Sequence, residues 1–264
     1  MTKMAKYYLI LHKTANMLRE ERLDYILKKL KTDQKVLQAE LSTDLQVSED
    51  TVRRDLESLA QDGLLIKVRG GAIPHSPNPY SFTERILLHE QDKQLMAQKA
   101  LSLLKDGQTI VLDGGTSTLV LAKLFPAHLK LTVVTNSVPI VAQLIEHPGV
   151  EVIFTGGRIF KDSRVASGLD TIRMIRRIRA DLCFLGVCSL HPVVGVTGLD
   201  LEETEVKTAM VESANRVVAI GTSDKMGTAE PFKVCEMTDI DTIITDKPGD
   251  AALQPYIDLG IQVI

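Results

Sequence analysis

From Gln108 to the C-terminus, short runs of β-branched and aliphatic residues alternate with stretches of helical pattern. The predicted strands are residues 109–112, 131–135, 150–155, 182–187, 216–220 and 242–245. Strands separated by helices of this length favour a parallel sheet with helices on both faces. The pattern therefore predicts an α/β domain with a mainly parallel, Rossmann-like sheet covered by helices. In such sheets, ligands bind outside the carboxyl ends of the strands.

Glycines and hydroxyl residues follow three successive predicted strands. Residues 113–118, Asp-Gly-Gly-Thr-Ser-Thr, come after the first strand, residues 135–137, Thr-Asn-Ser, after the second, and residues 155–158, Thr-Gly-Gly-Arg, after the third. Glycines let the backbone approach a ligand closely, and hydroxyls and free helix amides donate to an anion. We expect an anion site here, although Gly-Thr-Ser turns also serve as plain helix caps.

A second polar constellation lies at residues 198–207, a predicted helix start that is rich in acids. Glu203 and Lys207 are four residues apart, so they share one helical face and could form only an exposed ion pair. Alternatively they face the ligand edge of the sheet, where Lys207 would meet a phosphate and Glu203 a sugar hydroxyl. Lys225 would assist them.

The first seventy residues show a different pattern. Apolar residues recur at helical spacing over residues 23–30 and again over residues 37–45. Ser48 is placed to cap a third, amphipathic helix, and residues 64–73 then form a predicted hairpin whose tip carries Arg69 beside glycines. Three helices and a glycine-tipped hairpin in this order are typical of a winged helix-turn-helix, which binds double-stranded DNA.

The third helix carries the predicted DNA contacts. Its buried side is formed by Val52, Leu56 and Leu59, which leaves Arg53 and Arg54 in its first turns pointing elsewhere. An arginine pair on a helix is usually only a solvated face, but within a recognition helix we expect it to meet DNA. The predicted DNA-binding residues are Ser48, Thr51, Arg53, Arg54 and Arg69.

Three prolines between residues 74 and 79 predict an extended link between domains. Apolar spacing over residues 82–104 then predicts a connector helix, which Asp106-Gly107 ends. The predicted organisation is an N-terminal extension (1–18), the winged helix-turn-helix (19–74), a linker and connector helix (75–107), and the α/β domain (108–264). The extension fits neither domain's pattern.

Composition narrows the remaining classes of protein. No apolar run approaches the roughly 20 residues of a membrane span. The three cysteines, Cys183, Cys188 and Cys235, form no Cys-x-x-Cys pair, so neither a disulfide framework nor a zinc site is expected. We expect a cytoplasmic protein with no metal, no cofactor and no membrane partner. The net charge of −3 hides a small basic excess in the first 73 residues, which by itself says little about nucleic acid.

Residues 47–59 and 62–72 resemble the DNA-binding signature of the DeoR family of sugar-metabolism regulators. The polar motifs after residue 113, in their order, resemble that family's effector domain, which is itself similar to ribose-5-phosphate isomerase. The resemblance covers nearly everything from about residue 19. It implies a sequence-specific transcriptional regulator, a repressor of a carbohydrate catabolic operon that a phosphorylated sugar or related phosphate ester relieves.

The resemblance also implies roles for particular residues. A phosphate would be held by residues 115–118, and sugar hydroxyls would be met by Asp113, Asn136 and Glu203, with Lys207 nearby. The full predicted effector set is Asp113, Gly115, Thr116, Ser117, Thr118, Asn136, Gly157, Glu203, Lys207 and Lys225. The chain departs from the family pattern at Val187-Cys188-Ser189 and at Thr222-Ser223-Asp224-Lys225.

The expected partners are operator DNA and a small phosphorylated sugar. Recognition helices that occupy repeated or palindromic half-sites imply a homo-oligomer, either a dimer or a tetramer. One alternative is a sugar-phosphate isomerase-like enzyme fused to a DNA-binding domain. Residues 187–189 replace the acidic cluster of the isomerase and remove its proton carriers, so we expect no catalytic residue. A second alternative makes the α/β domain an oligomerisation scaffold without a ligand.

Overall fold

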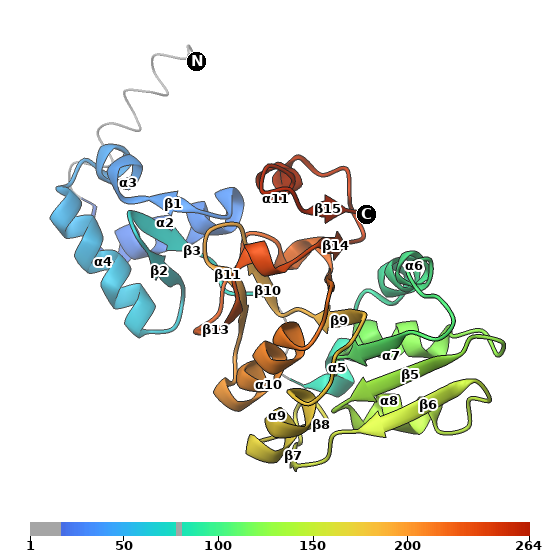
Figure 1. Cartoon of the computed structure of the whole chain (residues 1–264). Helices are drawn as coiled ribbons and strands as arrows, with labels where there is room; N and C mark the ends of the chain where they lie inside the picture. Colours follow the sequence, from blue (N-terminus) through green and yellow to red (C-terminus); the bar gives the residue numbers. More distant parts are fainter. Residues whose placement is uncertain (1–16, 78–80) are drawn as a thin grey trace. The chain divides into compact units, whose positions relative to one another are not determined.

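The computed structural model describes residues 17–77 and 81–264 of the chain (Figure 1). It contains two compact units, which are described separately. Of the described residues, 17–75 and 227–229 form the N-terminal unit, and 76–77, 81–226 and 230–264 form the C-terminal unit. Most of the predicted N-terminal extension, residues 1–16, lies outside the described residues.

The N-terminal unit is a winged helix-turn-helix, as predicted. Its elements are α2 (Arg19–Asp33), β1 (Val36–Leu37), α3 (Gln38–Leu45), α4 (Glu49–Gln61), β2 (Ile66–Val68) and β3 (Gly71–Ile73). The strands form an antiparallel sheet in the order β1-β3-β2. The two-residue strand β1 was not predicted, because it is too short to show an alternating pattern. It lies so close to β3 that a Cβ on Gly71 would come within 2.0 Å of the Val36 carbonyl oxygen.

Helix α4 begins and packs as its sequence predicts. The Ser48 hydroxyl accepts a hydrogen bond from the Thr51 amide at 3.2 Å, which satisfies one of the free N–H groups of the first turn. Val52, Leu56 and Leu59 are buried in the core of the unit. Their burial on one side of the helix leaves its other side exposed.

The C-terminal unit contains the predicted parallel sheet. Its strands are β4 (Thr109–Leu112), β5 (Leu131–Thr135), β6 (Val150–Phe154), β9 (Leu182–Gly186), β12 (Val217–Ile220), β14 (Thr242–Ile244) and β15 (Gln262–Val263). They lie in the order β15-β14-β12-β9-β4-β5-β6, and each neighbouring pair is parallel. The first six strands match the predicted runs, whereas β15 was missed because only two of its residues pair.

Helices cover both faces of this sheet. They are α5 (Phe82–Leu87), α6 (Glu90–Leu101), α7 (Thr116–Lys123), α8 (Val138–Leu144), α9 (Leu169–Ile175), α10 (Leu201–Glu212) and α11 (Gln254–Ile257), with 3-10 turns at Ser223–Lys225, Met237–Asp239 and Ala251–Leu253. Side chains alternate along β9, so Phe184 packs in the core with α6, α7 and α8, while Leu185 packs in the core with α9, α10 and α11. Two apolar layers therefore hold the carboxyl ends of the strands in fixed positions.

The segment predicted as one helix, residues 82–104, forms the two helices α5 and α6. The break occurs at His89, whose φ of 52° is left-handed and cannot continue an α-helix. The Lys93 amine fills the break by donating to the carbonyl oxygens of Arg85 and Leu88. Periodicity detects the apolar face of both helices but not this change of direction.

The pattern of alternating strands and helices did not predict two small antiparallel sheets of this unit. One is the hairpin of β7 (Arg158–Phe160) and β8 (Val165–Ser167). The other is a sheet of β10 (Ser189–His191), β11 (Gly195–Gly198) and β13 (Phe232–Cys235). All of these strands have three or four residues, which is too few for a clear periodicity.

Candidate functional site

The exposed side of α4 carries the two arginines predicted to contact DNA. The Arg53 guanidinium lies 2.6 Å from the Asp50 carboxylate and 2.9 Å from that of Glu57, and Arg54 lies 2.7 Å from Asp50. Hydrogen bonding from Arg53 lowers the pKa of Asp50 below its usual value. Both arginines are exposed, and ion pairs in water are weak, so a phosphate could replace the carboxylates.

The remaining predicted DNA contacts lie on the same unit. Ser48 is exposed at the N-cap of α4, and its hydroxyl lies 2.9 Å from that of Thr51. Arg69 is exposed at the turn between β2 and β3, where Gly70 adopts a left-handed φ of 83°. A recognition helix and a hairpin tip that both carry exposed arginines form the arrangement with which winged helix-turn-helix domains meet DNA.

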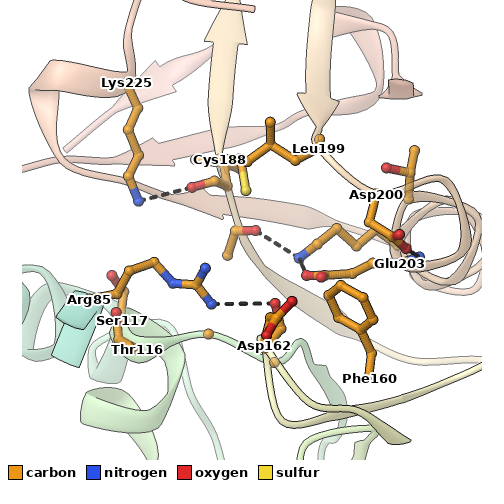
Figure 2. A pocket seen from close by; sticks show the side chains of 18 of the residues that line it. Arg85, Thr116, Ser117, Phe160, Asp162, Cys188, Leu199, Asp200, Glu203 and Lys225 are labelled. Atoms are coloured by element: carbon orange, nitrogen blue, oxygen red, sulfur yellow. Dashed lines mark hydrogen bonds and ion pairs between the residues drawn. The ribbon is translucent and has the colours of Figure 1, made fainter. Parts of the chain in front are cut away.

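The C-terminal unit contains a cavity of about 230 Å³ at the carboxyl ends of β4, β9 and β12. Residues that follow these strands line it, including the glycine and hydroxyl turn after β4 (Figure 2). Six of the predicted effector residues line the cavity: Gly115, Thr116, Ser117, Glu203, Lys207 and Lys225. The structure therefore brings together two motifs that are almost ninety residues apart in the sequence.

Asp113 lies directly behind the cavity wall, where it is 1% exposed. Its carboxylate accepts hydrogen bonds from the Lys207 amine and, at 2.9 Å, from the Gly186 amide. Burial raises the pKa of Asp113, and Lys207 opposes this shift. The Lys207 amine also donates to the Gly186 carbonyl oxygen at 3.0 Å and lies 3.8 Å from a Glu203 carboxylate oxygen.

The sequence left open whether Glu203 and Lys207 form only an exposed ion pair on the helix surface, and the structure shows that they do not. Lys207 is only 5% exposed, and both side chains line the cavity. Burial alone would lower the pKa of Lys207, but the carboxylates of Asp113 and Glu203 outweigh it and raise the pKa. The amine is thus held in its charged form by the protein itself.

Besides Asp113, three more of the ten predicted effector residues do not line the cavity. The Thr118 hydroxyl donates to the Gly115 carbonyl oxygen, and the Asn136 side-chain amide donates to the Ala166 carbonyl oxygen, both at 3.0 Å. Gly157 is closely packed, since a Cβ there would lie 2.2 Å from the Thr171 hydroxyl oxygen. For Asn136 the cause is the unpredicted hairpin, because β8 lies against the residues that follow β4 and β5. A Cβ on Gly114 would be 2.1 Å from the Val165 side chain.

Several cavity residues were not predicted from the sequence. Arg85 reaches the cavity from α5, and Phe160, Asp162 and Ser163 reach it from the β7–β8 hairpin (Figure 2). Cys188, where the chain departs from the family pattern, also lines the cavity, and burial raises the pKa of its thiol. No spacing in the sequence marks the hairpin residues, because the short strands β7 and β8 leave no periodic signal.

Within residues 17–77 and 81–264, no three or more His, Cys, Asp or Glu side chains are grouped so that they could hold a metal ion. In the same described part of the chain, no helix is long and apolar enough to cross a membrane. The cavity of the C-terminal unit is lined by hydrogen-bonding and charged side chains, among them Ser117, Glu203 and Lys225.

Comparison with known families supports both halves of this description. Residues 22–77 match the DeoR-like helix-turn-helix domain, and residues 88–247 match the DeoR C terminal sensor domain. HTH-type transcriptional regulator GolR of Listeria innocua is 33% identical over 246 residues, which cover 92% of this chain and 97% of the relative. HTH-type transcriptional repressor GlcR of Bacillus subtilis is 32% identical over 251 residues, which cover 94% of this chain and 96% of the relative.

Among solved structures, ribose 5-phosphate isomerase A from Methanocaldococcus jannaschii is similar to the chain at 17% identity, with a TM-score of 0.38. The similarity covers 52% of this chain and 54% of the isomerase.

Proposed function

This chain belongs to the DeoR family of DNA-binding transcriptional regulators, and we propose that it represses a carbohydrate catabolic operon until a phosphorylated sugar occupies the cavity of its C-terminal unit. The observation that carries the proposal is the polar cavity, whose lining residues, apart from Arg85, belong to the segment that matches the family's sensor domain. As a DNA-binding regulator it would act in the cytoplasm, on the chromosome.

For the DNA half, we propose that Arg53, Arg54 and Thr51 on α4 contact the major groove and its phosphates, with Ser48 beside them and Arg69 reaching from the hairpin. The exposed arginines of both elements support this assignment. Phosphate contacts would set the position of the helix, and base contacts would set the sequence that it recognises. Binding to two half-sites would require at least a dimer.

For the sensor half, we propose that the start of α7 binds the phosphate group of the effector. Thr116 and Ser117 line the cavity there, and the first amides of a helix lack intrahelical partners and attract anions. Glu203, close to Asp113 and Lys207, would accept hydrogen bonds from sugar hydroxyls. Lys225 would lie near the phosphate. Thr118, Asn136 and Gly157 would act only by supporting the wall.

Thermal unfolding with a panel of sugar phosphates, each paired with its unphosphorylated sugar, tests the sensor half. A ligand at 100 times its Kd should stabilise the unit that binds it by about 2.7 kcal/mol. We expect at least one sugar phosphate to raise the unfolding temperature while its parent sugar does not. If no phosphate ester shifts unfolding, the C-terminal unit is an oligomerisation scaffold and the sensor proposal is wrong.

We further propose that the protein is not an isomerase. Isomerisation needs a proton carrier near the substrate carbonyl, and at positions 187–189 Val187 and Ser189 are buried while Cys188 has a raised pKa. Asp113 is occupied by its pairing with Lys207. Purified protein should not convert ribose 5-phosphate to its ketose, and turnover that Glu203→Gln abolishes would contradict this.

A further inference from the structure

The cationic side chains of the cavity differ in what surrounds them. Arg85, Lys207 and Lys225 all line it. In Figure 2, Arg85 and Lys225 reach into the cavity from one side, whereas Glu203 reaches in from the other. The side with Arg85 and Lys225 is the cationic side and the side with Glu203 is the acidic side, while Asp162 also lines the cavity. Two such sides would orient a ligand that carries an anion at one end and hydroxyls at the other.

Lys207 belongs to the acidic side. Its amine pairs with Asp113 and lies 3.8 Å from the Glu203 carboxylate. This cluster therefore presents two acidic side chains for one amine. A dianionic phosphate placed against it would meet repulsion, so Lys207 is poorly suited to be the main phosphate contact.

On the opposite side, Arg85, Lys93 and Lys225 lie close enough for their charges to act on one another, with Asp224 as an acid near both lysines. Lys225 donates to the Val187 carbonyl oxygen at 3.0 Å, and Lys93 donates to two carbonyl oxygens at the end of α5. Burial and then the charges of Lys225 and Arg85 lower the pKa of Lys93 to about 8. Burial also lowers the pKa of Lys225, and Arg85 adds to that shift. A bound anion would relieve this mutual repulsion.

We propose that Arg85 is the residue that recognises the phosphate group of the effector, in concert with the Thr116–Ser117 start of α7 and Lys225. This inference rests on the proposed function and assigns its phosphate contact. A guanidinium can donate two parallel hydrogen bonds to one phosphate, which makes arginine more selective for phosphate than for a hydroxyl. Lys207 then holds Asp113 and Glu203 in place on the sugar side.

The position of Arg85 also connects the ligand to the linker. α5 is the first helix after the proline-rich segment, and the β7–β8 turn holds it. The Phe82 amide donates to the Asp162 carbonyl oxygen at 3.0 Å, and the Arg85 guanidinium donates to the Ser163 hydroxyl at 3.3 Å. A phosphate that attracts Arg85 would therefore act on the helix that the chain enters directly from the linker.

Calorimetric titration with inorganic phosphate, at constant ionic strength, tests the assignment on the full chain. We would compare wild type with Arg85→Ala, Arg85→Met and Arg85→Lys, and use Arg173→Ala as a matched control. Arg173 is exposed on α9 and does not line the cavity. Charged hydrogen bonds contribute about 1.5–3 kcal/mol, so the alanine and methionine variants should bind phosphate at least about tenfold more weakly. Lysine should recover part of the loss.

Each result bears on a different claim. Alanine and methionine variants that bind within about twofold of wild type would overturn the role of Arg85 while leaving the sensor proposal intact. If methionine restores binding and lysine does not, the side chain only packs, and the assignment is wrong. If wild type binds neither phosphate nor any sugar phosphate, the sensor proposal itself fails. Circular dichroism of each variant, compared with wild type, separates lost binding from lost folding.

Discussion

Replacing Lys207 with methionine would leave the Asp113 carboxylate buried without its ion-pair partner. Asp113 is 1% exposed and accepts hydrogen bonds from the Lys207 amine and the Gly186 amide. In the variant, the bond from Lys207 is lost and the bond from Gly186 stays. A buried carboxylate that loses its cation either keeps an unpaired charge or takes up a proton. The cheaper of these two responses sets the loss of stability.

The cost of protonation gives the magnitude. A carboxyl group with a reference pKa of about 3.9 costs about 4 kcal/mol to protonate at pH 7 and about 1.5 kcal/mol at pH 5. Breaking buried ion pairs by removing one partner generally costs about 3–5 kcal/mol, which agrees with the value at pH 7. Because the folded variant binds a proton that the unfolded chain releases, the loss of stability should shrink as the pH falls from 7 to 5.

Urea unfolding at pH 7 and pH 5 measures this effect, and hydrogen exchange of the β9 amides identifies the transition of the C-terminal unit. The control is Asp113→Asn/Lys207→Met, which removes both charges and retains an acceptor for the Gly186 amide. We expect the single variant to gain stability relative to this control as the pH falls. A single variant that loses less than about 1 kcal/mol at both pH values would refute the buried ion pair.

Three further predictions concern the two units. Arg53→Ala should weaken operator binding by about 1–3 kcal/mol in a fluorescence anisotropy titration and leave unfolding unchanged, since its ion pairs are exposed; wild-type affinity would contradict this. Leu56→Ala should destabilise the N-terminal unit by about 2–5 kcal/mol in thermal unfolding, because the side chain is fully buried; a loss below about 1 kcal/mol would show that it is not. Lys93, with a pKa of about 8, is charged below that pH and neutral above it. The phosphate affinity measured by calorimetry should therefore fall as the pH rises through 8 in wild type but not in Lys93→Met. Equal pH profiles of the two proteins would show that the charge of Lys93 does not contribute to the cationic side with Arg85 and Lys225.

Five strands of the parallel sheet, β4, β5, β9, β12 and β14, could be predicted because each is a run of mostly buried apolar residues. The polar turn after β4 could be predicted for a related reason: parallel topology places every such turn at the same edge. Helix α4 carried both a capping serine and an apolar face, so its start and its exposed side followed from local chemistry.

The missed parts depend on contacts between distant segments. The hairpin containing Val165 covers the ends of β4 and β5, and it therefore keeps Asn136 out of the cavity that Thr116 and Ser117 line. Arg85 reaches the cavity because the chain turns at His89, a left-handed residue that periodicity cannot detect. Local patterns specify secondary structure, whereas a ligand cavity is decided by where the short connecting elements pack.

The central claim is that a phosphorylated sugar in the C-terminal cavity controls DNA binding by the N-terminal unit. Its most direct test is fluorescence anisotropy of an operator fragment, selected by the protein from random DNA, during titration with sugar phosphates and with their parent sugars. We predict that one sugar phosphate changes the operator affinity at least about fivefold, the lower end of typical allosteric coupling, and that its parent sugar does not. An operator affinity that no sugar phosphate changes, although one of them binds, would contradict the account.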